Sequence, residues 1–91
     1  VKHMAVLGAG TMGGGIAQVA ADKGIAVRMK DINNDALALG YRHASEIFGK
    51  MVKRKRLTKF EYDAKMSLIS GTLDFSGFKQ MDVVVEAIVE D

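Results

Sequence analysis

Three glycines near the start of the chain have the spacing of a phosphate-binding loop. Gly8, Gly10 and Gly13 form a G-x-G-x-x-G pattern directly behind a short apolar run. The first glycine of such a loop allows a sharp turn, the second lets a diphosphate approach the backbone, and the third lets a helix pack closely on a strand. We expect the free N–H groups of Thr11, Met12 and Gly13 to point at phosphate oxygens. The pattern therefore predicts a dinucleotide-binding site.

An acidic residue follows this loop at an informative distance. Asp31 comes 18 residues after Gly13, close to the spacing of about 20 for the acid that holds the adenosine ribose. A carboxylate there repels the 2′-phosphate of NADP, so the expected cofactor is NAD. An alternative remains open, in which Asp31 only begins an Asx turn with Asn33. Gly14 and Gly15 exceed the fingerprint, and we expect them to serve helix packing.

The elements that must position these residues alternate between strand and helix patterns. Strands are expected at residues 3–8, 25–31, 72–75 and 82–89, with a turn or single helical turn between the last two. Helices are expected at 12–23, then for about six turns from a cap at Asn33 or Asn34, and then from a Thr58–Glu61 capping box to Gly71. The long helix is expected to bury the face made of Leu37, Tyr41, Ala44, Phe48, Met51 and Lys55. The helix after it is expected to bury Tyr62, Met66 and Ile69.

The order of these elements predicts an α/β fold. Strands separated mainly by helices require right-handed crossovers, so we expect a Rossmann-type parallel sheet of about four strands with helices on both faces. Residues 1–91 are interpreted as the N-terminal portion of one such domain, because a very hydrophobic strand pattern ends just before the last residue. An unpaired apolar fourth strand predicts self-association or poor solubility.

Composition excludes several other classes. The chain has 91 residues, 48% of them hydrophobic, but no run of 18 apolar residues, so neither a transmembrane helix nor a signal peptide is expected. It contains no cysteine, which excludes disulfides, thiolate catalysis and thiolate metal sites, and no metal is expected.

Three separated strings together resemble a known family. They are "GAGTMGGGIA", "KDIN" and "VVVEAIVED", and they resemble the NAD-binding domain of 3-hydroxyacyl-CoA dehydrogenases, most closely the dehydrogenase part of the bacterial multifunctional fatty-acid oxidation α-subunit. The resemblance implies NAD-dependent oxidation of an (S)-3-hydroxyacyl-CoA to a 3-oxoacyl-CoA in fatty-acid β-oxidation. It also implies a cytoplasmic location, if the protein is bacterial, and a thiolase subunit as a partner. It also implies that Met12 lies against the cofactor, that Asp31 holds the ribose, and that Ile88, Val89 and Glu90 pass beside the cofactor.

The same resemblance places the catalytic histidine, and the glutamate that orients it, well after the fourth strand. No catalytic residue is therefore expected in these 91 residues, and His3 and His43 receive no catalytic role. Glu86 is interpreted as a charged group at a strand end that needs a partner. We expect the isolated chain to bind NAD without turning over substrate.

A basic cluster at residues 50–59 admits three interpretations. It contains Lys50, Lys53, Arg54, Lys55, Arg56 and Lys59. A solvated helix end with cations near its C-terminus is the simplest. The family resemblance implies the second, in which Arg54 or its neighbours contact the phosphates of CoA. Nucleic-acid binding comes last, because aromatic residues do not interleave the cations and the net charge is only +2.

Two other functions share parts of this pattern. A non-catalytic dinucleotide-sensing module would use the same glycines and acid without substrate residues. Dehydrogenases of the hydroxyisobutyrate or phosphogluconate type also carry a glycine loop with methionine, but they lack the combination of "GGGIA" with "VEAIVE" found here.

Overall fold

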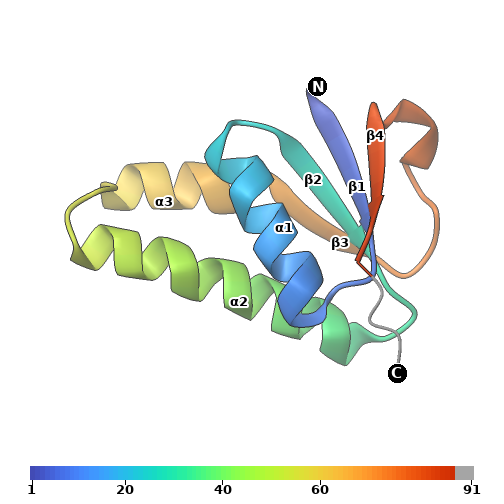
Figure 1. Ribbon diagram of the computed structural model, residues 1–91, viewed down its shortest axis with the longest axis horizontal. Helices are drawn as coiled ribbons and strands as arrows, with labels where there is room; N and C mark the ends of the chain where they lie inside the picture. The colour runs from blue at the N-terminus through green and yellow to red at the C-terminus, as the bar shows by residue number, and fades with distance from the viewer. Residues whose placement is uncertain (88–91) are drawn as a thin grey trace.

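The computed structural model describes residues 1–87 of the chain (Figure 1). Its elements, in order, are β1 (His3–Leu7), α1 (Gly10–Asp22), β2 (Ala26–Lys30), α2 (Asn34–Lys53), α3 (Lys59–Met66), β3 (Ile69–Thr72), the 3₁₀ helix η1 (Phe78–Gln80) and β4 (Val83–Glu86). The predicted succession of strands and helices is confirmed.

The four strands form one parallel sheet. Their order across the sheet is β3-β2-β1-β4, and every neighbouring pair runs parallel. The chain moves from β1 outward to β3 and then returns past β1 to place β4 on its other side. Strand order therefore reverses beside β1, and open α/β sheets bind ligands at the carboxyl ends of the strands on either side of such a point.

The two faces of the sheet have different covers. Val27 and Met29 of β2 are buried against the helices, in a core that also contains Phe48. Arg28, between them in sequence, points to the opposite face because side chains alternate along a strand, and its Nη1 donates to the carbonyl oxygen of Ser76 at 3.0 Å. Helices α1 to α3 thus cover one face, seen together in Figure 1, and within the described residues the connection that contains η1 contacts the other face at β2.

The two longest helices meet through glycines. A Cβ on Gly14 of α1 would lie 2.4 Å from the carbonyl oxygen of Gly40 in α2, so the two backbones are in direct contact. The predicted packing role of Gly14 is confirmed. A Cβ on Gly15 would only reach ordinary contact with the ring of His43, at 3.7 Å.

Capping side chains fix where α2 and α3 begin. The Asn33 side chain accepts a hydrogen bond from the Asp35 N–H at 2.7 Å, which confirms the predicted cap. The Thr58–Glu61 capping box is also present, with bonds of 3.1 and 3.0 Å. The predicted inward face of α2 is correct except for Lys55, which lies beyond the helix end, is exposed and has a φ of 60°.

The third strand lies earlier than predicted. Helix α3 ends at Met66, and β3 runs from Ile69 to Thr72 rather than over residues 72–75. The prediction treated Gly71 as a helix stop and Ile69 as part of the helix face. Gly71 is in fact a strand residue, whose Cβ would lie 3.3 Å from the side chains of Leu37 and Tyr41. Because Gly71 has no side chain, α2 can approach the sheet at this point.

The remaining boundaries differ by small amounts. Helix α1 begins at Gly10, two residues before the predicted start, because the glycine loop itself forms the first turn. Strand β4 covers Val83–Glu86 of the predicted 82–89, and the Ala87 N–H continues the pairing by donating to the carbonyl oxygen of Leu7 at 2.7 Å. Within the described chain β4 lies at an edge of the sheet.

Candidate cofactor site

The loop from β1 to α1 uses its glycines for different purposes. Gly8 has a φ of 99° and turns the chain out of β1, while its N–H donates to the carbonyl oxygen of Lys30 at 2.7 Å. A Cβ on Gly13 would lie 2.2 Å from the carbonyl oxygen of Gly8, so the helix could not approach the loop with any larger residue there. A Cβ on Gly10, whose φ is 71°, would meet no atom within 4 Å. Open space thus lies beside Gly10, where the fingerprint places a diphosphate.

Helix α1 begins at this loop without a side-chain cap. Its N-cap residue, Ala9, offers no side-chain hydrogen bond. The Gly13 N–H donates to the carbonyl oxygen of Ala9 at 3.3 Å, so the expectation that this N–H is free for phosphate is wrong. That bond closes the first helical turn. The N–H groups of Gly10, Thr11 and Met12 precede it and have no acceptor within the helix, which leaves them available to an anion.

Asp31 is held by two backbone donors at the edge of the loop. Its Oδ2 accepts from the Ala9 N–H at 3.0 Å, and its Oδ1 accepts from the Asn33 N–H at 3.2 Å. The Asx turn with Asn33 therefore exists, and so does a direct link to the glycine loop. Because a carboxylate oxygen has two lone pairs, each oxygen can accept a further hydrogen bond from a ligand hydroxyl.

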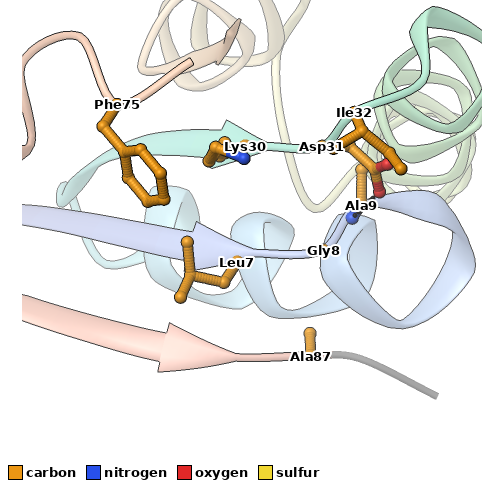
Figure 2. A pocket seen from close by; sticks show the side chains of 8 residues that line it. All are labelled: Leu7, Gly8, Ala9, Lys30, Asp31, Ile32, Phe75 and Ala87. Atoms are coloured by element: carbon orange, nitrogen blue, oxygen red, sulfur yellow. Dashed lines mark hydrogen bonds between the residues drawn. The ribbon is translucent and has the colours of Figure 1, made fainter. Parts of the chain in front are cut away.

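A cavity of about 450 Å³ opens beside Asp31. It lies at the carboxyl ends of β1 and β2 and reaches the residue after β4 and the loop after β3 (Figure 2). Its lining residues are Leu7, Gly8, Ala9, Lys30, Asp31, Ile32, Phe75 and Ala87. The volume and the position at the reversal of strand order suit a small-molecule or cofactor pocket.

Six of these lining residues were not predicted as site residues from the sequence, namely Leu7, Ala9, Lys30, Ile32, Phe75 and Ala87. Lys30 places its Nζ 4.4 Å from the centre of the Phe75 ring, and Ile32 has 87% of its surface exposed. Ile32 could have been suspected, since it directly follows Asp31. Phe75 was missed because residues 72–75 were predicted as a strand, whereas Phe75 lies in the loop after β3.

Among the described residues, the other predicted cofactor residues, Gly10, Thr11, Met12 and Gly13, do not line this cavity. Thr11 and Met12 line a separate hollow of about 500 Å³ along the outer side of α1, and Met12 is 52% exposed. Their backbone N–H groups, rather than their side chains, belong to the glycine loop. Arg54 is exposed at the C-terminal end of α2. The predictions for Ile88, Val89 and Glu90 fall outside the described residues.

Neither His3 nor His43 lines the cavity. Residues 1–87 bring no three His, Cys, Asp or Glu side chains close enough together to hold a metal ion. Among the helices in the same range, none combines the length and apolar character of a membrane-spanning segment.

A parallel sheet in this order, a glycine turn into a helix and an acid at the end of the second strand together define a Rossmann-type dinucleotide-binding domain. Comparison with known proteins gives the family. The chain belongs to the family described as 3-hydroxyacyl-CoA dehydrogenase, NAD binding domain, whose model matches residues 3–91. NAD is the cofactor that this family of domains binds.

Curated relatives carry the same segment within much longer chains. The fatty acid oxidation complex subunits alpha of a Psychrobacter species and of Acinetobacter baylyi are each 47% identical over all 91 residues. The chain spans only 13% of the length of either relative.

Solved structures show the same fold. The (S)-3-hydroxybutyryl-CoA dehydrogenase of Ralstonia eutropha superposes with a TM-score of 0.92 at 32% identity, and all of this chain covers 32% of it. The 3-hydroxybutyryl-CoA dehydrogenase of Escherichia coli gives 0.90 at 33% identity, with all of this chain covering 19% of it.

Proposed function

We propose that the chain is the cofactor-binding part of an NAD-dependent dehydrogenase that oxidises (S)-3-hydroxyacyl-CoA to 3-oxoacyl-CoA. The observation that carries the proposal is the placement of Asp31, whose carboxylate is tied to the Ala9 N–H at the mouth of the glycine loop. The family match and the names of the relatives support the substrate class. Bound NAD supplies the acceptor for the hydride that leaves the 3-carbon of the substrate.

The glycine loop and Asp31 fit the diphosphate and the adenosine ribose of NAD. The diphosphate would lie in the open space beside Gly10, against the N–H groups of Thr11 and Met12. Asp31 accepts from the hydroxyls of the adenosine ribose with the lone pairs that its two backbone donors leave. A 2′-phosphate at that ribose would bring negative charge against the carboxylate, so NAD is favoured over NADP.

Titration of NAD and NADP into the purified chain tests this assignment. The native chain is expected to prefer NAD, and Asp31→Ala to weaken NAD binding by roughly ten- to a hundred-fold, since hydrogen bonds to a charged group are lost. The affinity for NADP should change less, so that the ratio of the affinities for NAD and NADP falls. Glu46→Gln, which changes an exposed acid on α2, is the matched control. Equal binding of NAD and NADP by the native chain would contradict the role of Asp31.

Substrate and partners extend the proposal beyond the described cavity. We assign the CoA phosphates to Arg54 within the exposed cluster that ends α2. We also assign Met12, Ile88, Val89 and Glu90 to contacts with the cofactor, as the family resemblance implies. The parent protein is proposed to act within a bacterial fatty acid oxidation complex, as the relatives' names suggest. A cytoplasmic location and a thiolase subunit as partner are proposed on the family resemblance alone. A sensing module and a hydroxyisobutyrate-type dehydrogenase have less support, because the matching family is that of 3-hydroxyacyl-CoA dehydrogenases.

A further inference from the structure

The connection between α2 and α3 concentrates positive charge at one end of the molecule. Residues 50–59 contain six of the thirteen lysines and arginines and no acid, whereas the other seven share the rest of the chain with all eleven acids. This segment therefore carries a formal charge of +6 and the remainder −4. Figure 1 shows the connection at one end of the molecule and the sheet at the other. The net charge of +2 conceals this separation.

The cations of this connection are open to water. Lys53, Lys55 and Arg56 are exposed, and none of them forms an ion pair with an acid in the described part of the chain. Lys59 does form one, with Asp63 at 2.9 Å. Charges that no neighbouring carboxylate neutralises attract an external anionic surface.

One large aromatic side chain lies among these cations. Phe60, in the first turn of α3, is 82% exposed. Leu57, three residues earlier, is buried in the core and anchors the connection, so Phe60 is not needed for that purpose. An exposed ring flanked by lysines and arginines is typical of segments that lie at a membrane surface, where the ring enters the headgroup region and the cations meet anionic lipids.

The connection keeps a lysine where glycine would be more stable. Lys55 has a φ of 60°, in the left-handed region. Its N–H donates to the carbonyl oxygen of Val52 at 3.0 Å, and the Arg56 N–H donates to that of Met51 at 2.8 Å. This pair of hydrogen bonds is the helix ending that usually has glycine at the position of Lys55. A residue with a Cβ is strained there, which is a reason to look for a function of its side chain.

We propose that Lys53, Lys55, Arg56 and Phe60, here called the basic tip, dock on an anionic lipid bilayer. Charge complementarity carries the proposal. Anionic headgroups attract the tip and repel the negatively charged remainder of the chain, so the tip faces the bilayer. Phe60 adds apolar contact at the level of the headgroups.

The basic tip is separate from the sites already described. None of its residues lines the cofactor cavity, and Arg54, which is assigned to CoA, is not part of it. Docking is therefore independent of NAD binding and of the proposed function. A nucleic acid fits the tip less well, because single strands are held by several stacked aromatic rings and the tip offers one.

Co-sedimentation of the chain with vesicles tests the proposal. One set contains phosphatidylcholine alone, and the other contains equal parts of phosphatidylcholine and anionic phosphatidylglycerol. The chain should bind the anionic vesicles only. Raising the salt from about 0.1 M to about 1 M should release it, because the screening length falls from about 10 Å to about 3 Å. Equal binding to both sets, or no binding to the anionic set, would overturn the proposal.

Paired charge reversals separate the tip from the overall charge. Lys55→Glu combined with Arg56→Glu should weaken binding to anionic vesicles by about ten- to a hundred-fold, since each cation near such a surface contributes about five-fold. Lys23→Glu combined with Lys79→Glu changes the net charge equally, at exposed positions outside the tip. This control should change binding by no more than about two-fold at 0.1 M salt. Equal losses in the two pairs would rule out docking through the tip.

The aromatic ring has its own test. Phe60→Ser should weaken binding to anionic vesicles about three- to ten-fold, because apolar contact with the headgroup region is lost. Leu39→Ser is the control, since Leu39 is 43% exposed on α2 and lies outside the tip. It should leave binding unchanged. An effect of Leu39→Ser as large as that of Phe60→Ser would remove the ring from the docking surface.

Lys55→Gly distinguishes docking from a structural role. Glycine relieves the strain at this position, so Tm measured by circular dichroism should rise by roughly 4–8 °C. Vesicle affinity should nevertheless fall about five-fold, because a cation is lost. A rise in Tm with no loss of vesicle affinity would remove Lys55 from the docking surface.

Competition separates a bilayer from a nucleic acid. Single-stranded RNA, at a phosphate concentration equal to that of the anionic lipid, should leave the chain on the vesicles. Complete release by this RNA would assign the tip to a nucleic acid and overturn the proposal. NAD binding should stay at its native value in every tip variant, so failure of docking and failure of the proposed function are observed separately.

Discussion

The packing of α1 on α2 makes a strong prediction for one glycine. A Cβ on Gly14 would lie 2.4 Å from the Gly40 carbonyl oxygen and 2.8 Å from the Gly40 Cα. Both are backbone atoms, which cannot rotate away as the end of a side chain can. Gly14→Ala must therefore separate the helices by about 1 Å, the difference between 2.4 Å and an ordinary contact of 3.4 Å.

Two opposing effects set the size of the change in stability. Alanine in a helix interior is more favourable than glycine by about 0.5–1 kcal/mol. Overpacking of an interior costs about 1–3 kcal/mol, and the upper end applies here because the contact joins two backbones. The free energy of unfolding should then fall by about 2 kcal/mol net. For a domain of this size, that lowers Tm by roughly 8–16 °C.

Two other glycines provide matched controls, measured by thermal and denaturant unfolding with circular dichroism. A Cβ on Gly49, also in α2, meets no atom within 4 Å. Gly49→Ala should therefore raise Tm by about 2–8 °C from helix propensity alone. A Cβ on Gly40 would meet the Met29 sulfur at 3.1 Å, and that flexible side chain can move. Gly40→Ala should fall between the other two variants.

The order of the three variants is the refutable part of the reasoning. A Gly14→Ala chain as stable as the Gly49→Ala chain, with native circular dichroism, would show that α1 and α2 do not meet backbone to backbone. An equal loss in Gly14→Ala and Gly49→Ala would instead show that these helices tolerate no added methyl group, whatever the local space.

Three further predictions concern the loop after β3, the basic cluster and turnover by the isolated chain. Asp74 has a pKa lowered to about 2 from 3.8, so its contribution to stability is present above its pKa in the unfolded chain and is lost as the pH falls through its pKa in the folded chain. The Tm difference between native and Asp74→Ala chains should therefore shrink between about pH 5 and pH 2. A Tm difference that stays constant over this range would contradict this account. Arg54→Ala should weaken binding of CoA about two- to five-fold, as expected for an exposed ion pair, whereas Lys23→Ala should leave it unchanged. The isolated chain, given 3-hydroxybutyryl-CoA and NAD, should form no NADH. Equal CoA affinity in the two variants would remove Arg54 from the substrate site, and NADH formation would overturn the absence of turnover.

Most of the fold could be predicted from local sequence patterns. Two glycines show where such a prediction succeeds and where it fails. Gly24, which follows a helical pattern, has a φ of 83° and does end that helix region. Gly71 follows a similar pattern but lies in β3, where it makes room for Leu37 and Tyr41. A single sequence does not distinguish a glycine required by its own dihedral angles from one required by a neighbouring helix.

The site was predictable to the extent that its chemistry is local. Gly8 turns the chain, Gly13 packs closely on the loop and Asp31 lies at the end of β2, as predicted, because a sharp turn, a close contact and a strand end are properties of short segments. The contact between Lys30 and Phe75 in the cavity lining is different, since it depends on how the connection after β3 crosses the sheet. The register of β3 had to be known first, and its prediction was three residues late.

The two hydrogen bonds of Asp31 give it a structural role that precedes any cofactor. They tie the end of β2 to the glycine loop through Ala9 and to the start of α2 through Asn33, whose own side chain caps that helix. A change at Asp31 therefore loosens the loop as well as removing a ribose acceptor. Loss of NAD affinity alone does not separate these effects, because a loosened loop weakens NAD and NADP alike. The ratio of the two affinities does separate them, since only the carboxylate opposes a 2′-phosphate.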